Sequence, residues 1–266
     1  MLTLGWFSTG RGEGSRNLLR AAMDAIQQGR LDARILYVFT NRGPGEAEGS
    51  DRYQDMVRGY SLPLVGFSSR EFRRQLGPDQ EWRLAYDRQV MTRLDAYKPD
   101  LCVLAGYMLI VGPLMCRTYS MINLHPAAPG GPVGQWQDVI WELISTQAKE
   151  AGARMHLVTE VLDMGPVVTY VTFPLHTPDL APMWDATKGK TVEELRAAHS
   201  DEHPLFKASR RKEAARELPL VVETLRAFAS GALRIQDRRV VDAEGCVIAG
   251  LCLNDTVEAQ LRPEDR

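Results

Sequence analysis

The hydrophobic positions along this chain follow two spacings in alternation, one typical of buried strands and the other of amphipathic helices. Continuous apolar runs predict strands at residues 2–8, 33–40, 62–67, 101–106 and 121–124. Apolar residues three and four positions apart predict helices at residues 16–28, 53–60, 80–97 and, as one short turn, 113–117. This order predicts an α/β fold, Rossmann-like and doubly wound, with a mostly parallel sheet and flanking helices.

The pattern changes after residue 126, where a stretch rich in Pro and Gly predicts a loop over residues 127–134. The second half then predicts a helix at 135–146, paired strands at 153–159 and 167–175, a polar excursion at 176–203 with a short helix near 191–198, a long helix at 205–230, and a hairpin at 233–236 and 239–242. Residues 243–266 look like a charged, frayed tail. No repeat and no linker interrupts the chain, so we expect one domain over residues 1–266.

Composition and charge narrow the function. The 266 residues are 44% hydrophobic and 25% charged, with a formal net charge of −2. A balance near neutrality argues against nucleic acid or an anionic membrane as the partner. The amino terminus has no signal-peptide pattern, and the four cysteines form no CxxC pair or metal-ligand spacing. We therefore expect a cytoplasmic protein that acts on small molecules.

The strongest chemical signal is the sequence Ile-Asn-Leu-His-Pro at residues 122–126. Asn123 and His125 are two positions apart, so on a strand their side chains leave from the same face. Pro126 ends the strand there, and ligands of open α/β sheets bind at this carboxyl edge. An amide and an imidazole suit a developing oxyanion, and Asp163 on a later loop could orient the ring. The alternative is a histidine that caps a turn.

A glycine-rich turn at residues 12–17, Gly-Glu-Gly-Ser-Arg-Asn, lies between a predicted strand and a helix. Such a turn presents backbone N–H groups and the positive end of a helix to an anion. It is not a P-loop, because no Gly-Lys-Ser/Thr follows. A tight turn with a serine cap accounts for it equally well.

Two further features depend on their surroundings. Arg83 lies on the helix that leads to the strand ending at residues 106–111, and it could hold a carboxylated ligand lying over that strand end. Alone, it reads as a solvated helix residue. His156, on the strand before Asp163, could join the catalytic residues or could be an ordinary sheet histidine.

Taken together, these segments resemble the folate-dependent formyltransferases, and most closely the branch that formylates glycinamide ribonucleotide in purine biosynthesis. The resemblance covers most of the chain, from residue 4 to about 241. Its most specific parts are Ala-Tyr-Asp-Arg at 85–88, Val-Leu-Ala-Gly-Tyr-Met at 103–108, Ile-Asn-Leu-His-Pro at 122–126 and the run from His156 to Val168. Several such blocks in the right order form a strong signal.

The resemblance implies formyl transfer from 10-formyltetrahydrofolate to a primary amine, without a metal. It assigns catalysis to Asn123, His125, Asp163 and His156. It assigns the folate to Arg83, Met108, Leu109, Ile110, Val111, Asn123, Thr159, Glu160, Val161, Leu162 and Asp163. It assigns the phosphorylated amine to Gly14, Ser15, Arg16, Asn17 and Glu213. The single domain would have a nucleotide-binding half at about 1–100, a catalytic and folate-binding half at about 101–242, and the tail.

The chemistry needs these groups for independent reasons. When the amine attacks the formyl carbon, the carbonyl oxygen becomes an oxyanion. Asn123 and a protonated His125 can both donate to it, and the loss of one such donor typically costs about 3 kcal/mol of barrier. We expect Asp163 to raise the pKa of His125 and to pass a proton from the amine through water.

Some positions depart from the family. Arg16 is an extra residue in the glycine-rich turn, Leu109 stands where an arginine is usual, and the 127–132 loop differs. The glutamate expected at the ribose could be Glu213 or Glu217. A formyltransferase with another amine acceptor, such as an amino sugar, and a non-catalytic ligand-binding module of the same fold remain alternatives. The partners expected are small molecules, and a homodimer is compatible with the resemblance.

Overall fold

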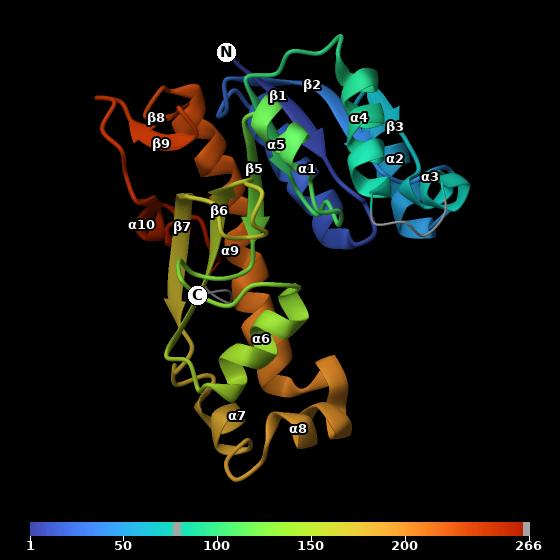
Figure 1. Ribbon diagram of the computed structural model, residues 1–266. Coiled ribbons are helices and arrows are strands. Elements are labelled where there is room, and N and C mark those ends of the chain that lie inside the picture. The colour runs from blue at the N-terminus through green and yellow to red at the C-terminus, as the bar shows by residue number, and fades with distance from the viewer. Residues whose placement is uncertain (77–80, 263–266) are drawn as a thin grey trace.

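A computed structural model describes residues 1–76 and 81–262 (Figure 1). Its centre is an eight-stranded sheet in the order β10-β7-β6-β5-β4-β1-β2-β3. Five strands are parallel: β1 (Leu2–Phe7), β2 (Ala33–Thr40), β3 (Leu64–Gly66), β4 (Leu101–Leu104) and β5 (Met121–His125). The prediction of a mostly parallel, doubly wound α/β sheet is confirmed.

The other three strands extend this sheet beyond β5. Strand β6 (Glu150–Leu157) runs antiparallel to β5, and β7 (Val167–Pro174) runs antiparallel to β6. The predicted pairing around the loop that carries Asp163 is therefore confirmed. Strand β10 (Leu251–Cys252) then adds in parallel to β7, and a separate hairpin consists of β8 (Leu233–Gln236) and β9 (Arg239–Asp242).

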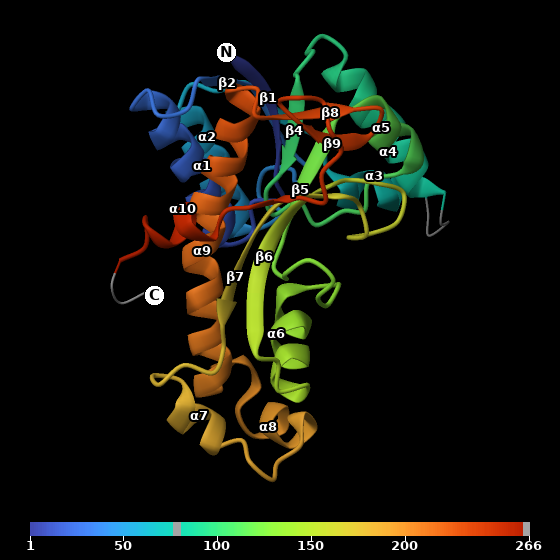
Figure 2. The same cartoon turned by 90° about the vertical axis from the view of Figure 1, so that its left-hand side faces the viewer.

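Helices cover both faces of the parallel strands, as Figure 2 shows edge-on. One face packs against α1 (Glu13–Gln27), α2 (Glu48–Gly59) and the carboxyl-terminal half of α9 (Pro204–Ala229). The opposite face packs against α4 (Trp82–Leu94), α5 (Pro113–Thr118) and a contribution from α3 (Ser69–Leu76). Because both faces are buried, the parallel strands read as continuous apolar runs rather than as alternating ones.

A third apolar cluster lies beyond the carboxyl ends of the parallel strands. It joins the ends of β6 and β7 to the first turns of α9 and to α6 (Trp136–Ser145), α7 (Ala181–Asp185) and α8 (Val192–His199), with a 3-10 turn at Ser200–Glu202. Figure 1 shows these helices as a lower lobe, separated along α9 from the parallel half of the sheet. The edge where ligands are expected faces this lobe.

The structure corrects the sequence-based prediction at several elements. Helices α3 and α7 were not expected, and α2 begins at Glu48 rather than near residue 53. The helix expected from residue 80 begins at Trp82, while residue 80 itself lies outside the described residues.

The tail expected to be frayed is ordered as far as it is described. Strand β10 pairs with β7, and α10 (Asn254–Glu258) packs on α9. The side chain of Val257 is fully buried, and the Asn254 amide oxygen accepts the Thr172 N–H at 2.8 Å. The buried apolar residues of this segment are Leu253, Val257 and Leu261. They order it because the edge of the sheet at β7 and the surface of α9 offer it places to pack.

Within residues 1–76 and 81–262, no helix combines the length and the apolar character that crossing a lipid bilayer requires.

Candidate active site

Two neighbouring strands carry the polar side chains predicted to act together. Asn123 and His125 end β5, and the antiparallel register sets Asn123 opposite His156 and His125 opposite Arg154 on β6. His125 and His156 are each only 2% exposed. Pro126 then turns the chain out of the sheet, so these groups lie at the carboxyl edge of the parallel strands, as expected.

Asp163 reaches this edge from the loop between β6 and β7. Its backbone has φ of +54°, a left-handed conformation that costs a non-glycine residue free energy unless the surroundings stabilise it. Gly165 lies so close to the Leu157 carbonyl that a Cβ atom there would stand 1.7 Å from the oxygen. This close approach folds the loop back over the site and requires glycine at that position.

Asn123, His125, His156 and Asp163 lie close together. The Asp163 carboxylate lies 3.5 Å from His125 Nδ1 through Oδ2 and 3.5 Å from His156 Nε2 through Oδ1. The Asn123 Nδ2 atom is 3.3 Å from His156 Nε2, and the two imidazole rings are 6.2 Å apart between centroids. The structure therefore brings an amide, two imidazoles and a carboxylate into one cluster.

The partners of each ring indicate what it can donate. His156 Nδ1 is 2.9 Å from the Leu157 carbonyl, so this nitrogen carries a proton and donates it there. In the neutral ring Nε2 then accepts from the Asn123 amide, which leaves the second amide hydrogen of Asn123 available to a ligand. His156 thereby orients Asn123, a role typical of a group behind the reacting residues.

His125 is bound on both sides. Its Nε2 donates to the Pro132 carbonyl at 2.9 Å, while Nδ1 faces Asp163. Burial is the largest influence and lowers the pKa of His125 below its usual value of 6.5, and the positive charge of Arg154 acts in the same direction. The Pro132 carbonyl and Asp163 act the other way. Asp163 thus acts to raise the pKa of His125, as expected, but desolvation outweighs the carboxylate and the net shift is downward.

The pKa of Asp163 is shifted below its usual range. Burial is the largest single influence and raises it, but the contact with His156, the charges of both histidines and the Gly134 N–H together outweigh burial. The carboxylate therefore stays ionised at neutral pH, as a proton acceptor in this position requires.

Apolar side chains surround the approach to this cluster on two loops. Met108, Ile110, Val161 and Leu162 are between 42% and 63% exposed, although they are large and hydrophobic. Such exposure of large apolar side chains is typical of a surface that a ligand covers. Leu109 is half-buried and Val111 is buried, so the predicted folate residues divide into an exposed and a supporting set.

The loop after β4 has a defined shape. Gly106 has φ of +72°, and a Cβ atom there would stand 2.3 Å from Ser15 Oγ. Thr9 N donates to the Gly106 carbonyl, and Met108 N donates to Thr9 Oγ1. The ends of β1 and β4 are thus tied together between the glycine-rich turn and the apolar loop.

The other residues predicted to bind the folate lie at the margin. Arg83 is exposed, with its guanidinium 5.8 Å from the centroid of the Trp82 ring. Thr159 donates to the Val161 carbonyl at 3.0 Å and so shapes its own loop. Glu160 is paired with Arg117 at 2.5 Å on α5, which directs its carboxylate to the protein surface rather than to the cluster.

A helix follows β1 as predicted, but α1 begins at Glu13 after Gly12, so most of the predicted glycine-rich turn is the first turn of the helix. The first backbone N–H groups of a helix have no partner within it, and a Cβ atom at Gly14 would meet nothing within 4 Å. Arg16 points away, since its Nη1 lies 3.4 Å from the Gly49 carbonyl, and Asn17 accepts from Arg20. Gly14 and Ser15 can hold an anion here; Arg16 and Asn17 are engaged elsewhere.

Glu213 does not join the cluster. It lies on α9, 1% exposed, and accepts from Arg210 Nη1 at 2.8 Å, while Arg210 also contacts Glu217 at 2.6 Å. Burial, followed by the neighbouring charge of Glu217, holds the pKa of Glu213 well above its usual range. Its assignment to the ribose stays a prediction.

Arg154 also lies beside this cluster, opposite His125 in the strand register, and was not predicted from the sequence. Its guanidinium is buried and donates to the carbonyl of Asp163. The signal was present, because Arg154 is two residues before His156 and so shares its strand face. It was not recognised because a buried arginine cannot be distinguished from a surface one by its spacing.

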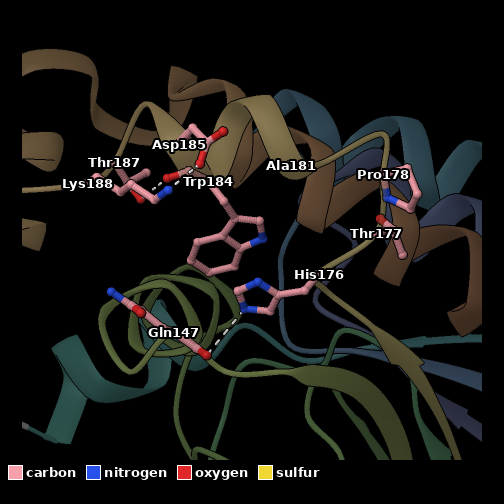
Figure 3. Close-up of a pocket in the computed structure, with 9 residues that line it drawn as sticks. All are labelled: Gln147, His176, Thr177, Pro178, Ala181, Trp184, Asp185, Thr187 and Lys188. Carbon is pink, nitrogen blue, oxygen red and sulfur yellow. Dashed lines mark hydrogen bonds and ion pairs between the residues drawn. The ribbon is translucent and has the colours of Figure 1, made fainter.

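Within the described residues, no group of three or more His, Cys, Asp and Glu side chains is placed to hold a metal ion. A pocket of about 380 Å³ is lined by residues of the 176–203 segment and Gln147, around the stacked rings of His176 and Trp184 (Figure 3). Asn123, His125, His156 and Asp163 do not line it. The site is thus defined by converging side chains rather than by the volume of a cavity.

A mostly parallel α/β sheet whose strand ends assemble an amide, two imidazoles and an ionised carboxylate defines a group-transfer enzyme. The sequence model of the Formyl transferase family matches residues 11–181, nearly two thirds of the chain, and that span includes all four clustered residues. This chain belongs to the formyl transferase family.

Individual relatives agree with this assignment. Phosphoribosylglycinamide formyltransferase of Escherichia coli is 29% identical over 173 residues, which are 62% of this chain and 72% of that protein. Glycinamide ribonucleotide transformylase 1 of Symbiobacterium toebii has 27% identity, a TM-score of 0.64, and coverage of 90% of this chain and 93% of its own. The phosphoribosylglycinamide formyltransferase of Coxiella burnetii, at 24% identity, shows the same fold with a TM-score of 0.68 over 94% and 98% of the two chains.

Proposed function

We propose that this enzyme transfers the formyl group of 10-formyltetrahydrofolate to the primary amine of glycinamide ribonucleotide, a step of purine biosynthesis. The observation that carries the proposal is the Asp163 carboxylate, 3.5 Å from both His125 and His156, with the Asn123 amide beside them. The relatives named for this reaction support the choice of substrates.

In the proposed reaction the amine nitrogen attacks the formyl carbon, and the carbonyl oxygen takes up negative charge. The free amide hydrogen of Asn123 donates to that oxygen. His125 also donates its Nε2–H to that oxygen. In the free protein this N–H donates to the Pro132 carbonyl, so the oxyanion replaces the carbonyl as its acceptor. Because the pKa of His125 is depressed in the free protein, we expect the charge that develops on the substrate to favour its protonated form.

Asp163 moves the proton. As the new C–N bond forms, the amine loses a proton, and the ionised Asp163 carboxylate receives it through a bound water. The proton then passes to the folate nitrogen as the C–N bond to the donor breaks, so the ionised carboxylate is regenerated. The pKa of Asp163, held below its usual range, keeps the carboxylate free to accept at the start of each turn.

The two substrates approach from opposite sides. We assign the folate to the exposed apolar residues Met108, Ile110, Val161 and Leu162, with Arg83 near its carboxylated tail. We assign the acceptor phosphate to the backbone N–H groups around Gly14 and Ser15, because a helix amino terminus favours an anion. Apart from Arg83, the donor side then belongs to residues 101–242 and the phosphate side to residues 1–100 of one domain. We expect the enzyme to work in the cytoplasm, and gel filtration can test whether it forms a homodimer.

The test mixes purified protein with the 10-formyl donor and glycinamide ribonucleotide, and follows deformylation of the donor by absorbance. Turnover is expected from the wild type and not from Asp163→Asn or His125→Ala. Asp185→Asn, a carboxylate of the remote pocket, serves as the matched control and should turn over normally. With an acceptor that lacks the phosphate, KM should be much higher than with glycinamide ribonucleotide, and kcat should change less.

A different amine acceptor is the second candidate, and the burial of Glu213 against Arg210 favours considering it. Donor binding without turnover on glycinamide ribonucleotide, followed by turnover on a phosphorylated amino sugar, would replace the acceptor and keep the chemistry. Absence of donor binding would support the non-catalytic module and refute the proposal.

A further inference from the structure

Arg154 is a buried charged group beside the clustered residues, and the proposed reaction gives it no task. Its side chain comes from the centre of β6, opposite His125 in the strand register, and the residue is 4% exposed. Burying a guanidinium is costly unless its donors are satisfied. Its partners therefore indicate why it is there.

Those partners are backbone carbonyls on two different loops. Nη1 donates to Ala127 O at 3.2 Å and to Ala128 O at 2.7 Å, on the loop that follows His125. Nη2 donates to Asp163 O at 3.1 Å, on the loop between β6 and β7. A rigid planar fork can bind both loops at once, whereas a lysine ammonium carries its donors on one atom.

The bond to Asp163 falls on a strained residue. The backbone of Asp163 has φ of +54°, and its carboxylate faces two histidines while its carbonyl accepts from Arg154. A charged donor on that carbonyl stabilises the left-handed conformation. The same guanidinium holds the start of the loop whose Pro132 carbonyl accepts from His125.

We propose that Arg154 is a positioning residue for formyl transfer, which clamps the 126–134 and 158–166 loops together and so fixes Asp163 against His125. The inference rests on the proposed function for its catalytic consequence, but the clamp itself can be tested without any substrate. Arg154, at the centre of β6, thus joins the two loops to each other, which neither loop can do alone.

The positive charge has a second consequence. The groups facing His125 are Asp163 from the 158–166 loop, Arg154 and His156 from β6, and the Pro132 carbonyl from the 126–134 loop. Among these Arg154 acts to lower the pKa of His125. Removing the positive charge should therefore raise the pKa of His125. Removing only the planar guanidinium, while keeping the charge, should not.

Two substitutions separate these effects. Arg154→Met keeps an unbranched side chain and removes both charge and fork, whereas Arg154→Lys keeps the charge and removes the fork. We expect kcat to fall about 100-fold in Arg154→Met, as for a small misplacement of a catalytic group. Arg154→Lys should lose about 10-fold, with KM for both substrates within about threefold in each variant.

The matched control is Arg216→Met. Arg216 is 2% exposed and also holds two segments together, through the Lys212 carbonyl and Glu258. These two partners lie on α9 and α10, outside the cluster of Asn123, His125, His156 and Asp163. If a buried arginine matters only for stability, the Arg216 and Arg154 variants should lose activity in proportion to their loss of melting temperature. The proposal requires Arg154→Met to lose far more kcat than Arg216→Met at equal folded fraction.

The titration of His125, followed by NMR of histidine-labelled protein without substrates, gives the second measurement. We expect its pKa to rise in Arg154→Met and to stay near the wild-type value in Arg154→Lys. Unchanged kcat in both folded variants, or a His125 titration that does not move in Arg154→Met, would overturn the inference. If the wild type fails to formylate glycinamide ribonucleotide while the titration shifts as expected, the proposed function fails and the clamp stands.

Discussion

Two regions of this protein place a histidine beside an aspartate-containing segment, and they differ in almost every other respect. In the catalytic cluster His125 and His156 are each 2% exposed, and both rings face one carboxylate at 3.5 Å. In the remote pocket the exposed His176 stacks on Trp184 with centroids 4.5 Å apart, and its Nε2 lies 3.4 Å from the Gln147 carbonyl (Figure 3). Only the first region fixes every polar atom of its rings.

The difference teaches how to recognise chemistry in this fold. The remote pocket offers about 380 Å³ of space, yet its ionisable groups satisfy one another locally, as Lys188 does with Asp185 at 2.7 Å. The catalytic cluster draws four side chains from two strands and a loop to one point. Reactivity depends on converging groups that have shifted pKa values, and volume alone does not supply them.

The largest expected effect comes from Asp163→Asn. Replacing the carboxylate removes the proton acceptor and the charge opposite His125, while the shape is kept, so kcat/KM should fall by about 10³-fold or more. A steady-state assay with both substrates measures this. Asp185→Asn in the remote pocket is the control, and equal losses in the two variants would erase the distinction between the regions.

Asn123→Ala should have the next largest effect. It removes one oxyanion donor and leaves His156 Nε2 without its amide partner, so kcat should fall about 10²- to 10³-fold with a small change in KM. Gln147→Ala removes an amide side chain from the remote pocket and should leave kcat unchanged. A loss confined to KM in Asn123→Ala would mean that this amide binds the ground state only.

A smaller effect concerns stability against acid. Because the pKa of His125 in the folded protein lies below 6.5, the unfolded chain takes up a proton first as the pH falls below 6.5. The stabilisation from burying the neutral ring is present above that value, and it is lost as the pH falls through the folded pKa. One such group contributes at most about 1.4 kcal/mol per pH unit.

Urea unfolding at pH 7.5 and 5.5 tests this. The wild type should lose more stability between the two than His125→Gln does. Some pH dependence should remain in the variant, because burial also lowers the pKa of His203. Identical pH dependence in the two proteins would show that the ring at position 125 is not held neutral.

The smallest effect should come from His176→Ser. The ring is exposed and its stacking on Trp184 is its main contact, so the free energy of unfolding should fall by less than about 1 kcal/mol. Activity should be unchanged. A clear loss of kcat would mean that the remote pocket communicates with the catalytic cluster, and the contrast drawn between them would need revision.

Much of this protein follows from local pattern. Continuous apolar runs predicted the five parallel strands, because a strand buried on both faces has no polar side to alternate with. The positions of Asn123, His125 and Asp163 were predictable because two-residue spacing, a terminating proline and the return of the chain through β6 and β7 leave little choice of geometry. Helix α7 and the docking of residues 251–258 were missed, because short amphiphilic segments gain their stability from a neighbouring surface rather than from their own sequence.

The chain by itself determined which chemical groups stand at the sheet edge. Only the folded protein decided their electrical state, since burial, Arg154, Asp163 and the Pro132 carbonyl all act on His125. The same applies to Glu213, which the fold encloses with Arg210 instead of presenting it to a ligand. Desolvation and charge are sums over all neighbours in space, and no spacing along a sequence records them.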